Sequence, residues 1–393
     1  MIRLLFVDDE PNLLRAVERM LRPRADEWDM TFVQSGPEAL AMLAEDAFEV
    51  VVSDMRMPEM DGATLLQHVR RDYPDTIRII FSGQSSRAET LKAVSPAHQF
   101  IAKPCSAEEL MGIIDQTLAL RSTIRSPRIT ELVTGIDSLP SLPGLYAALT
   151  EELNRPEPRM DVVASIIERD PGMMANILKL VNSAFFGLRR RVSDVRQAIS
   201  LLGIDTITVL VLTKGVFEQF DPAALHGISL EAVWAHSTSA ARIASEIAKS
   251  DGAQPCICQD AFTSGMLHNV GKLVMASDVS LLADPADVPH GEVGAYLLGL
   301  WGLPDPIVGA IAFHQTPSRS STQTVDALTY LHVGSRWATS LDVDCEDGCI
   351  ESVDLPYVDR VASRDRLGQW CAVAAGLAFG AVDEGEELSS VNG

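Results

Sequence analysis

Across the first 121 residues, short runs of branched and aromatic residues alternate with longer amphipathic stretches. Five short runs occur, at residues 2–7, 30–33, 49–53, 77–82 and 99–102. The stretches between them, such as PNLLRAVERMLR and GPEALAMLAEDA, have the length and apolar spacing of helices. An alternation of this kind favours a parallel sheet covered by helices on both faces. We therefore expect residues 1–121 to form an α/β doubly wound domain around a five-stranded parallel sheet.

Residues with carboxylate, hydroxyl or ammonium side chains lie where these strands end. Asp8 and Asp9 follow the first strand, Asp54 follows the third, Ser82 ends the fourth, and Lys103 follows the fifth. In such a sheet, ligands bind beyond the carboxyl ends of the strands. Crowded carboxylates need a hard cation, and Mg²⁺ prefers carboxylates, waters and phosphate oxygens. Beside that ion Asp54 can act as a nucleophile toward a phosphoryl group, and Lys103 supplies a second cation for the phosphoryl oxygens.

The segments FVDDE, VVSDMRMPEMDG, FSG and FIAKP resemble those of a response-regulator receiver domain, which is CheY-like and has a flavodoxin-like fold. The resemblance implies that Asp54 is the phosphoacceptor. It also implies that Asp8, Asp9, Asp54 and the backbone carbonyl of Met55 bind Mg²⁺. The phosphoryl donor would then be a sensor histidine kinase or a phosphotransfer protein.

The same resemblance implies a set of switch residues. Ser82 would move to bond the new phosphoryl group, and Lys103 would contact its oxygens. Phe100 stands at the switch-aromatic position, where tyrosine is frequent, and it has no hydroxyl to donate. We also expect Pro104 to follow a cis peptide bond that aims the lysine.

From about residue 130 the strand signals fade, and helical patterns separated by turns rich in Gly, Pro and Asp follow. Ser106 and Glu109 have the spacing of a capping box, so the last helix of the first domain should begin there. We expect that helix to run past residue 121 and to emerge as a connector. The predicted organisation is a helical linker at 122–130 and an all-α domain at 131–340.

Six of the eight histidines lie in the predicted helical region, several of them on apolar stretches such as VWAHS, GMLHN and AIAFHQ. Together with LPSLPG, VRQAISLLG and HGEVGAYLLGLWGLP, this pattern resembles the HDOD domain over about residues 130–335. HDOD domains are the catalytically degenerate relatives of the HD and HD-GYP phosphohydrolases. The resemblance implies an output domain that binds a partner rather than an enzyme.

The histidine pattern departs from that of an active phosphohydrolase at two positions. An aspartate that follows the histidine brings the negative charge that holds a divalent ion, whereas Asn269 is neutral. A second defect is Gln315, where HD-GYP proteins often have histidine. We interpret the set as a degenerate HD site without catalytic residues or an expected cofactor, consisting of His236, His268, Asn269, His290 and His314. The alternatives are an all-imidazole site for Zn²⁺, if these histidines converge, or an intact hydrolase.

Beyond residue 340 the chain becomes acidic. We expect residues 341–382 to form an acidic loop and helices that pack on the helical domain, and residues 383–393 to be disordered.

Charge and hydropathy narrow the functional classes. The net charge is −22, and residues 1–121, 122–340 and 341–393 are each acidic, so nucleic acid is an improbable partner. Neither a signal peptide nor a membrane-length apolar run is evident, and we expect a cytoplasmic protein without a membrane partner.

The leading interpretation is a two-component response regulator in which phosphorylation of Asp54 switches a non-catalytic HDOD domain that binds an unknown protein partner. One alternative is a receiver-gated metal-dependent phosphodiesterase acting on a cyclic dinucleotide. Another is a nucleotide sensor that binds without hydrolysis. A homodimer formed through the connector is plausible, and a DNA-binding output is the least favoured.

Overall fold

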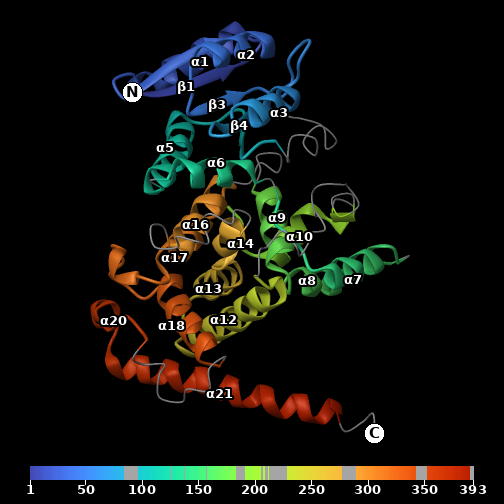
Figure 1. Ribbon diagram of the computed structural model, residues 1–393, viewed down its shortest axis with the longest axis vertical. Helices are drawn as coiled ribbons and strands as arrows, with labels where there is room; N and C mark the ends of the chain where they lie inside the picture. The colour runs from blue at the N-terminus through green and yellow to red at the C-terminus, as the bar shows by residue number, and fades with distance from the viewer. Residues whose placement is uncertain are drawn as a thin grey trace.

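The computed structural model describes residues 1–83, 96–182, 191–211, 228–276, 289–341 and 352–389, apart from positions 125, 137, 156, 205–206 and 209–210. At residues 123, 340–341 and 378–389 it describes the backbone alone. A sheet domain lies at one end of the molecule, and a larger helical domain extends from it to the long C-terminal helix (Figure 1).

The sheet domain contains five parallel strands, as predicted. The strands are β1 (Ile2–Val7), β2 (Trp28–Val33), β3 (Val50–Ser53), β4 (Ile77–Ser82) and β5 (Gln99–Ala102), in the spatial order β2-β1-β3-β4-β5. The order reverses between β1 and β3, where open sheets of this type bind their ligands.

Side chains of successive strand residues point to opposite faces and build two separate cores. Leu4 and Phe6 belong to the core under α1 (Pro11–Leu21) and α5 (Ala107–Thr123). Leu5 and Val7 belong to the core under α2 (Gly36–Glu45) and α3 (Gly62–Asp72). A short 3-10 helix, η1 (Arg22–Arg24), follows α1. The doubly wound α/β prediction is confirmed.

The connector consists of two helices. The hydroxyl oxygen of Ser106 accepts a hydrogen bond from the amide of Glu109 at 3.1 Å and caps α5, which ends at Thr123. After a short break, α6 (Pro127–Gly135) begins. Residues 122–130 thus include the end of α5 and the first turn of α6, with a short break between the two helices.

The region after α6 is built from helices in the described part of the chain, in agreement with the predicted all-α domain. They are α7 (Pro143–Leu153), α8 (Met160–Ile167), α9 (Pro171–Val181), α10 (Val195–Leu202), α12 (Leu230–Ser250), α13 (Pro255–Leu267), α14 (Val270–Ala276), α16 (His290–Leu300), α17 (Asp305–Phe313), η4 (Pro317–Arg319) and α18 (Ala327–Leu341). Of the described helices, none is both long and apolar enough to cross a bilayer.

The C-terminal segment contains α20 (Leu355–Val361) and α21 (Arg364–Ser389). The first part of α21 packs on the helical domain: Trp370 is buried, its ring lies 5.8 Å from that of Tyr330, and Arg366 pairs with Asp251 at 2.6 Å. The helix continues to Ser389, so residues 383–389 are helical rather than disordered, since three glutamates and a leucine among them favour helix. The acidic stretch 342–351 and residues 390–393 lie outside the described residues.

Candidate functional site

The sheet register brings the predicted site residues to one edge. Val7 is paired with Ser53, and Ser82 with Ala102, so the residues that follow these strands are neighbours. The amide of Asp54 donates to the carbonyl of Val7 at 2.8 Å, and the amide of Lys103 donates to the carbonyl of Ser82 at 2.8 Å. Backbone hydrogen bonds thus fix the phosphoacceptor candidate and the lysine on the sheet.

Lys103 lies between two of the three predicted carboxylates. Its Nζ donates to Asp8 Oδ2 at 2.5 Å and also to Asp54 Oδ1. All three side chains are largely buried, with exposed fractions of 17% for Lys103, 7% for Asp8 and 12% for Asp54. Burial strengthens this charge network because the local dielectric constant is lower than that of water.

The Asp54 carboxyl experiences opposing influences on its pKa. Burial raises the pKa of Asp54, and the hydrogen bond and charge of Lys103 lower it. The amide of Arg56 also donates to Asp54 Oδ2, at 2.5 Å, and opposes the effect of burial. The net direction is upward, as expected for a carboxylate whose desolvation is only partly offset by one cation.

The remaining predicted residues lie around this centre. Asp9 is exposed, and Ser82 is half-buried at the end of β4. The carbonyl of Met55 accepts a hydrogen bond from the amide of Gly62 at 3.0 Å, which leaves its second lone pair for another partner. The Lys103–Pro104 peptide bond is cis, as expected. Half-buried Phe100 packs against both cores of the sheet domain.

Gly62 has a structural role that the sequence interpretation missed. A Cβ atom at this position would lie 2.1 Å from the carbonyl oxygen of Asp54. Only glycine lets the start of α3 approach the loop after β3 so closely. The signal was present in the segment PEMDG, where Asp61 caps α3 by accepting a hydrogen bond from the amide of Thr64 at 2.8 Å.

The oxygen atoms at this edge of the sheet are ligands that suit a hard divalent ion. Asp8, Asp9 and Asp54 offer carboxylate oxygens, and Met55 adds a carbonyl oxygen, which are the ligand types that Mg²⁺ prefers. Three carboxylates exceed the single charge of Lys103, and a divalent cation would balance them. Within the described residues, no three His, Cys, Asp or Glu side chains are grouped so that they could hold a metal ion by themselves.

The four histidines of the predicted degenerate site converge from four different helices. The ring centroids of His236 and His268 are 5.5 Å apart, those of His268 and His314 are 5.0 Å apart, and those of His290 and His314 are 5.2 Å apart. These rings stand on α12, at the end of α13, at the start of α16 and at the end of α17.

Local hydrogen bonds orient two of these rings. His268 Nδ1 bonds the carbonyl of Gly265 at 2.6 Å, and His314 Nδ1 bonds the carbonyl of Ile311 at 2.8 Å. Each neutral ring therefore carries its proton on Nδ1 and has a lone pair on Nε2. Burial and neighbouring positive charge lower the pKa of His268 well below its usual value and lower the pKa of His314 to about 4. His268 and His314 are therefore neutral imidazoles near pH 7.

Asn269 lies beside the cluster and is 1% exposed. Its amide nitrogen donates to Ser237 Oγ at 3.2 Å, but its oxygen has no hydrogen-bond partner. His290 Nε2 and Gln315 Oε1 are likewise buried without a partner. At the position where active phosphohydrolases have an aspartate, the protein thus has a buried, uncharged side chain whose amide oxygen is a weak metal ligand. The structure brings all five residues of the degenerate site together, and among the described residues none of them forms a metal cage.

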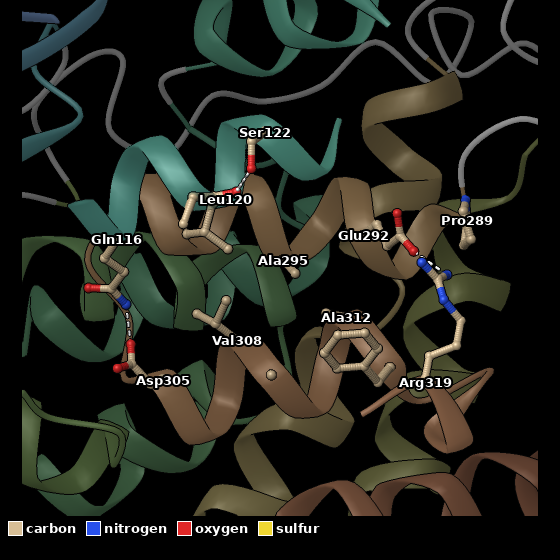
Figure 2. A pocket seen from close by; sticks show the side chains of 13 residues that line it. Gln116, Leu120, Ser122, Pro289, Glu292, Ala295, Asp305, Val308, Ala312 and Arg319 are labelled. Atoms are coloured by element: carbon tan, nitrogen blue, oxygen red, sulfur yellow. Dashed lines mark hydrogen bonds and ion pairs between the residues drawn. The ribbon is translucent and has the colours of Figure 1, made fainter. Parts of the chain in front are cut away.

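A partly open cavity of about 660 Å³ lies between the two domains, and the sequence interpretation did not anticipate it. Leu120 of α5, Ala295 of α16 and Val308 of α17 form its apolar walls. One end is closed by a hydrogen bond from Gln116 to Asp305, and the other by the ion pair between Glu292 and Arg319 (Figure 2). Such contacts between segments far apart in the sequence leave no local signal.

Comparisons with known proteins agree with both domains. The model of the response regulator receiver domain matches residues 4–115, and that of the HDOD domain matches residues 139–286. Of the curated relatives, an uncharacterized protein of Treponema pallidum is 28% identical over 201 residues, covering 46% of this chain and 38% of its own length. The transcriptional regulatory protein GlrR of Escherichia coli is 30% identical over 131 residues, covering 33% of this chain and 29% of its own length. The chain thus spans well under half of the length of these two curated relatives.

Two solved structures illustrate the likeness. The MmoQ response regulator of Methylococcus capsulatus is 21% identical with a TM-score of 0.45, covering 60% of this chain and 98% of its own. The signal receiver domain of an HD domain-containing protein of Pseudomonas fluorescens is 27% identical with a TM-score of 0.30, covering 31% of this chain and 98% of its own. From the two family models and the observed fold, the chain carries a response regulator receiver domain followed by an HDOD domain.

Proposed function

We propose that this protein is a two-component response regulator in which Asp54 accepts a phosphoryl group and the HDOD domain reads the result by binding a protein partner. The observation that supports this most strongly is the charge network of Lys103 with Asp8 and Asp54 at the carboxyl edge of the sheet. A carboxylate held beside a cation, with a surplus of negative charge that invites Mg²⁺, is suited to attack phosphorus.

Each residue has a defined part in this proposal. Asp54 supplies the nucleophilic oxygen, and Lys103 neutralises the charge on the transferring phosphoryl group. Mg²⁺, held by Asp8, Asp9, Asp54 and the Met55 carbonyl, would supply further positive charge. Ser82, at the end of β4, accepts a backbone hydrogen bond from Lys103, and its hydroxyl would bond the new group after a side-chain rotation. The donor would be a sensor histidine kinase or a phosphotransfer protein, and we place the exchange in the cytoplasm.

Removal of the metal tests this proposal. The full-length protein is incubated with acetyl phosphate, with Mg²⁺ or with excess EDTA, and the phosphorylated fraction is read by intact-protein mass spectrometry. We expect phosphorylation with Mg²⁺ and a loss of roughly a hundredfold or more in rate without it, since cations that offset transition-state charge contribute effects of this size. Equal rates in the two conditions would contradict the proposed magnesium site.

We further propose that the HDOD domain is not an enzyme. Asn269 cannot bring the carboxylate charge that a hydrolytic metal site needs. Burial, together with the nearby charge of Lys272, lowers the pKa of His290 and His314. Positive charge at that place disfavours a bound cation.

The convergence of four histidines favours one alternative in particular, a receiver-gated phosphodiesterase built on a residual metal site. Metal analysis of the purified full-length protein separates the two ideas. We expect far less than one equivalent of zinc, manganese or iron, and no hydrolysis of a cyclic dinucleotide. Stoichiometric metal that is lost in a His268→Ala variant, together with turnover, would establish the alternative.

A further inference from the structure

The ammonium group of Lys103 has a third neighbour besides the two carboxylates that it bonds. Its Nζ lies over the ring of Phe81, 5.1 Å from the ring centroid. A cation within about 6 Å of an aromatic centroid is attracted by the negative face of the ring. Lys103 is therefore held by Asp8 and Asp54 and, in addition, by an aromatic surface.

The register of the sheet puts Phe81 in this position. Phe81 of β4 is paired with Ile101 of β5, and Lys103 is two residues beyond Ile101. Because side chains alternate between the two faces of a sheet, this spacing places Phe81 and Lys103 on the same face. The amide of Lys103 donates to the carbonyl of Ser82 at 2.8 Å, which fixes the lysine beside the strand that carries the ring.

The ring of Phe81 is held in place by its own packing. Phe81 is 7% exposed and belongs to the core under α1 and α5, together with Phe6 and Ile101. Closely packed core side chains occupy defined rotamers, so the ring cannot turn its face away without disturbing this core. The aromatic surface is thus a rigid support, whereas the lysine above it has a flexible four-carbon stem.

The ring attracts the ammonium without using its hydrogen-bond donors. A lysine ammonium has three N–H donors, and the bonds to Asp8 and Asp54 use two of them. The ring face competes with no oxygen for a donor, so the third can point to an oxygen of an incoming phosphoryl group. An aliphatic side chain in place of Phe81 would exclude water from the ammonium in the same way but would offer no attraction in return.

We propose that Phe81 is a positioning residue for phosphoryl transfer, whose ring face keeps the Lys103 ammonium beside Asp54 while negative charge moves to the phosphoryl oxygens; this rests on the proposed phosphoacceptor function. In this step a carboxylate oxygen of Asp54 forms a bond to phosphorus. The bond from phosphorus to the leaving oxygen of the donor breaks, and the leaving group keeps the electron pair.

The attraction of the ring matters most in the transition state, because it does not change during the reaction. Asp54 loses part of its negative charge as the new bond forms, so its hold on Lys103 weakens. The remaining attraction of Asp8 would then draw the ammonium away from phosphorus, and the ring limits this displacement. A cation that is already in place needs no reorganisation in the transition state, which makes its electrostatic stabilisation most effective.

Fluorinated phenylalanines at position 81 test this role, because fluorine withdraws electron density from the ring face with little change in ring size. Phenylalanine with one, two or three ring fluorines is placed there in the full-length protein. Phosphorylation by acetyl phosphate with Mg²⁺ is followed by intact mass. We expect the rate to fall with each added fluorine, by roughly tenfold over the series, which is the size of a cation–π attraction in a desolvated site.

Phe48 provides the matched control, because its ring also carries a cation. Arg3 Cζ lies 4.9 Å from the centroid of the Phe48 ring. Phe48 lies just before β3, at the edge of the sheet opposite to Asp54. The same analogues at position 48 weaken that contact and should leave the phosphorylation rate within about twofold of wild type, as expected for distant sites.

Fluorine NMR detects the contact without any phosphorylation. A monofluorinated ring at position 81 should change its resonance when Lys103 is replaced in Lys103→Met, since the charge over the ring face is removed. The same ring at position 48 should keep its resonance in that variant. An unchanged resonance at position 81 would contradict the contact between the ammonium and the ring.

The outcomes separate this inference from the function on which it rests. A phosphorylation rate that stays constant across the three analogues at position 81 would contradict the positioning role while leaving the phosphoacceptor intact. An equal loss of rate at positions 48 and 81 would contradict it as well, because fluorination would then act on the domain as a whole. Absence of the phosphorylated mass from the wild-type protein would overturn the proposed function and the inference together.

Discussion

Asp54→Asn is expected to abolish phosphorylation by acetyl phosphate. The amide keeps the size of the carboxylate, and its oxygen can still accept one of the two hydrogen bonds, from Lys103 or from the Arg56 amide, so the fold should be unchanged. An amide oxygen is a poor nucleophile and brings no charge for Mg²⁺, so the labelled fraction should fall to background. The measurement is the intact mass of the full-length protein after incubation with acetyl phosphate and Mg²⁺.

A second carboxylate of the same domain provides the control for this variant. Asp72 is exposed at the end of α3, where it pairs with Arg71 at 2.7 Å. Asp72→Asn should be phosphorylated like the wild type. Wild-type phosphorylation of Asp54→Asn would show that another group is the acceptor.

Gly271→Ala is expected to destabilise the HDOD domain by about 3 kcal/mol, at the upper end of the usual range for overpacked cores. A Cβ at this position would lie 1.8 Å from the carbonyl oxygen of His290 and 2.8 Å from the amide nitrogen of Gly294. Both atoms belong to the backbone of α16, so no side-chain rotation can relieve the contact. Alanine's better helix propensity, worth up to about 1 kcal/mol, offsets only part of this cost.

Urea unfolding followed by circular dichroism measures this effect, and Gly309→Ala is the matched control. Gly309 also lies in a helix, but a Cβ there would meet no atom within 4 Å. Its replacement should be neutral or should stabilise the domain slightly. Equal unfolding midpoints for the two variants would contradict the close packing of α14 on α16. The glycine in the segment HNVGK is thus explained by helix packing.

The sheet and its site were predictable because local patterns determine them. Strands of four to six residues, separated by amphipathic helices, indicate a parallel sheet, and the rule that ligands bind at the carboxyl ends then groups Asp8, Asp54 and Lys103. The bridging position of Lys103 between the two carboxylates was beyond this reasoning, because side-chain geometry depends on tertiary packing.

The sequence predicted that the second domain is all-α, but it did not predict how its helices pack against one another. Histidines on four helices give no sequence signal that they converge, so their clustering had to await the structure. The hydrogen bond from Gln99 to the carbonyl of Gly299 in α16 joins residues 200 positions apart, and the continuous core between α5 and α16 has no local signature either. Low hydrophobicity suggested disorder after residue 382, whereas the helical propensity of the same residues carries α21 to Ser389.

The central claim is that the side chain of Asp54 carries the phosphoryl group. The most direct measurement is borohydride reduction of the acyl phosphate in wild-type protein treated with acetyl phosphate and Mg²⁺, followed by peptide mass spectrometry. Reduction should convert Asp54 to homoserine in the peptide that spans β3 and the loop after it. Homoserine at another aspartate, or phosphorylated protein with Asp54 unmodified, would contradict the account.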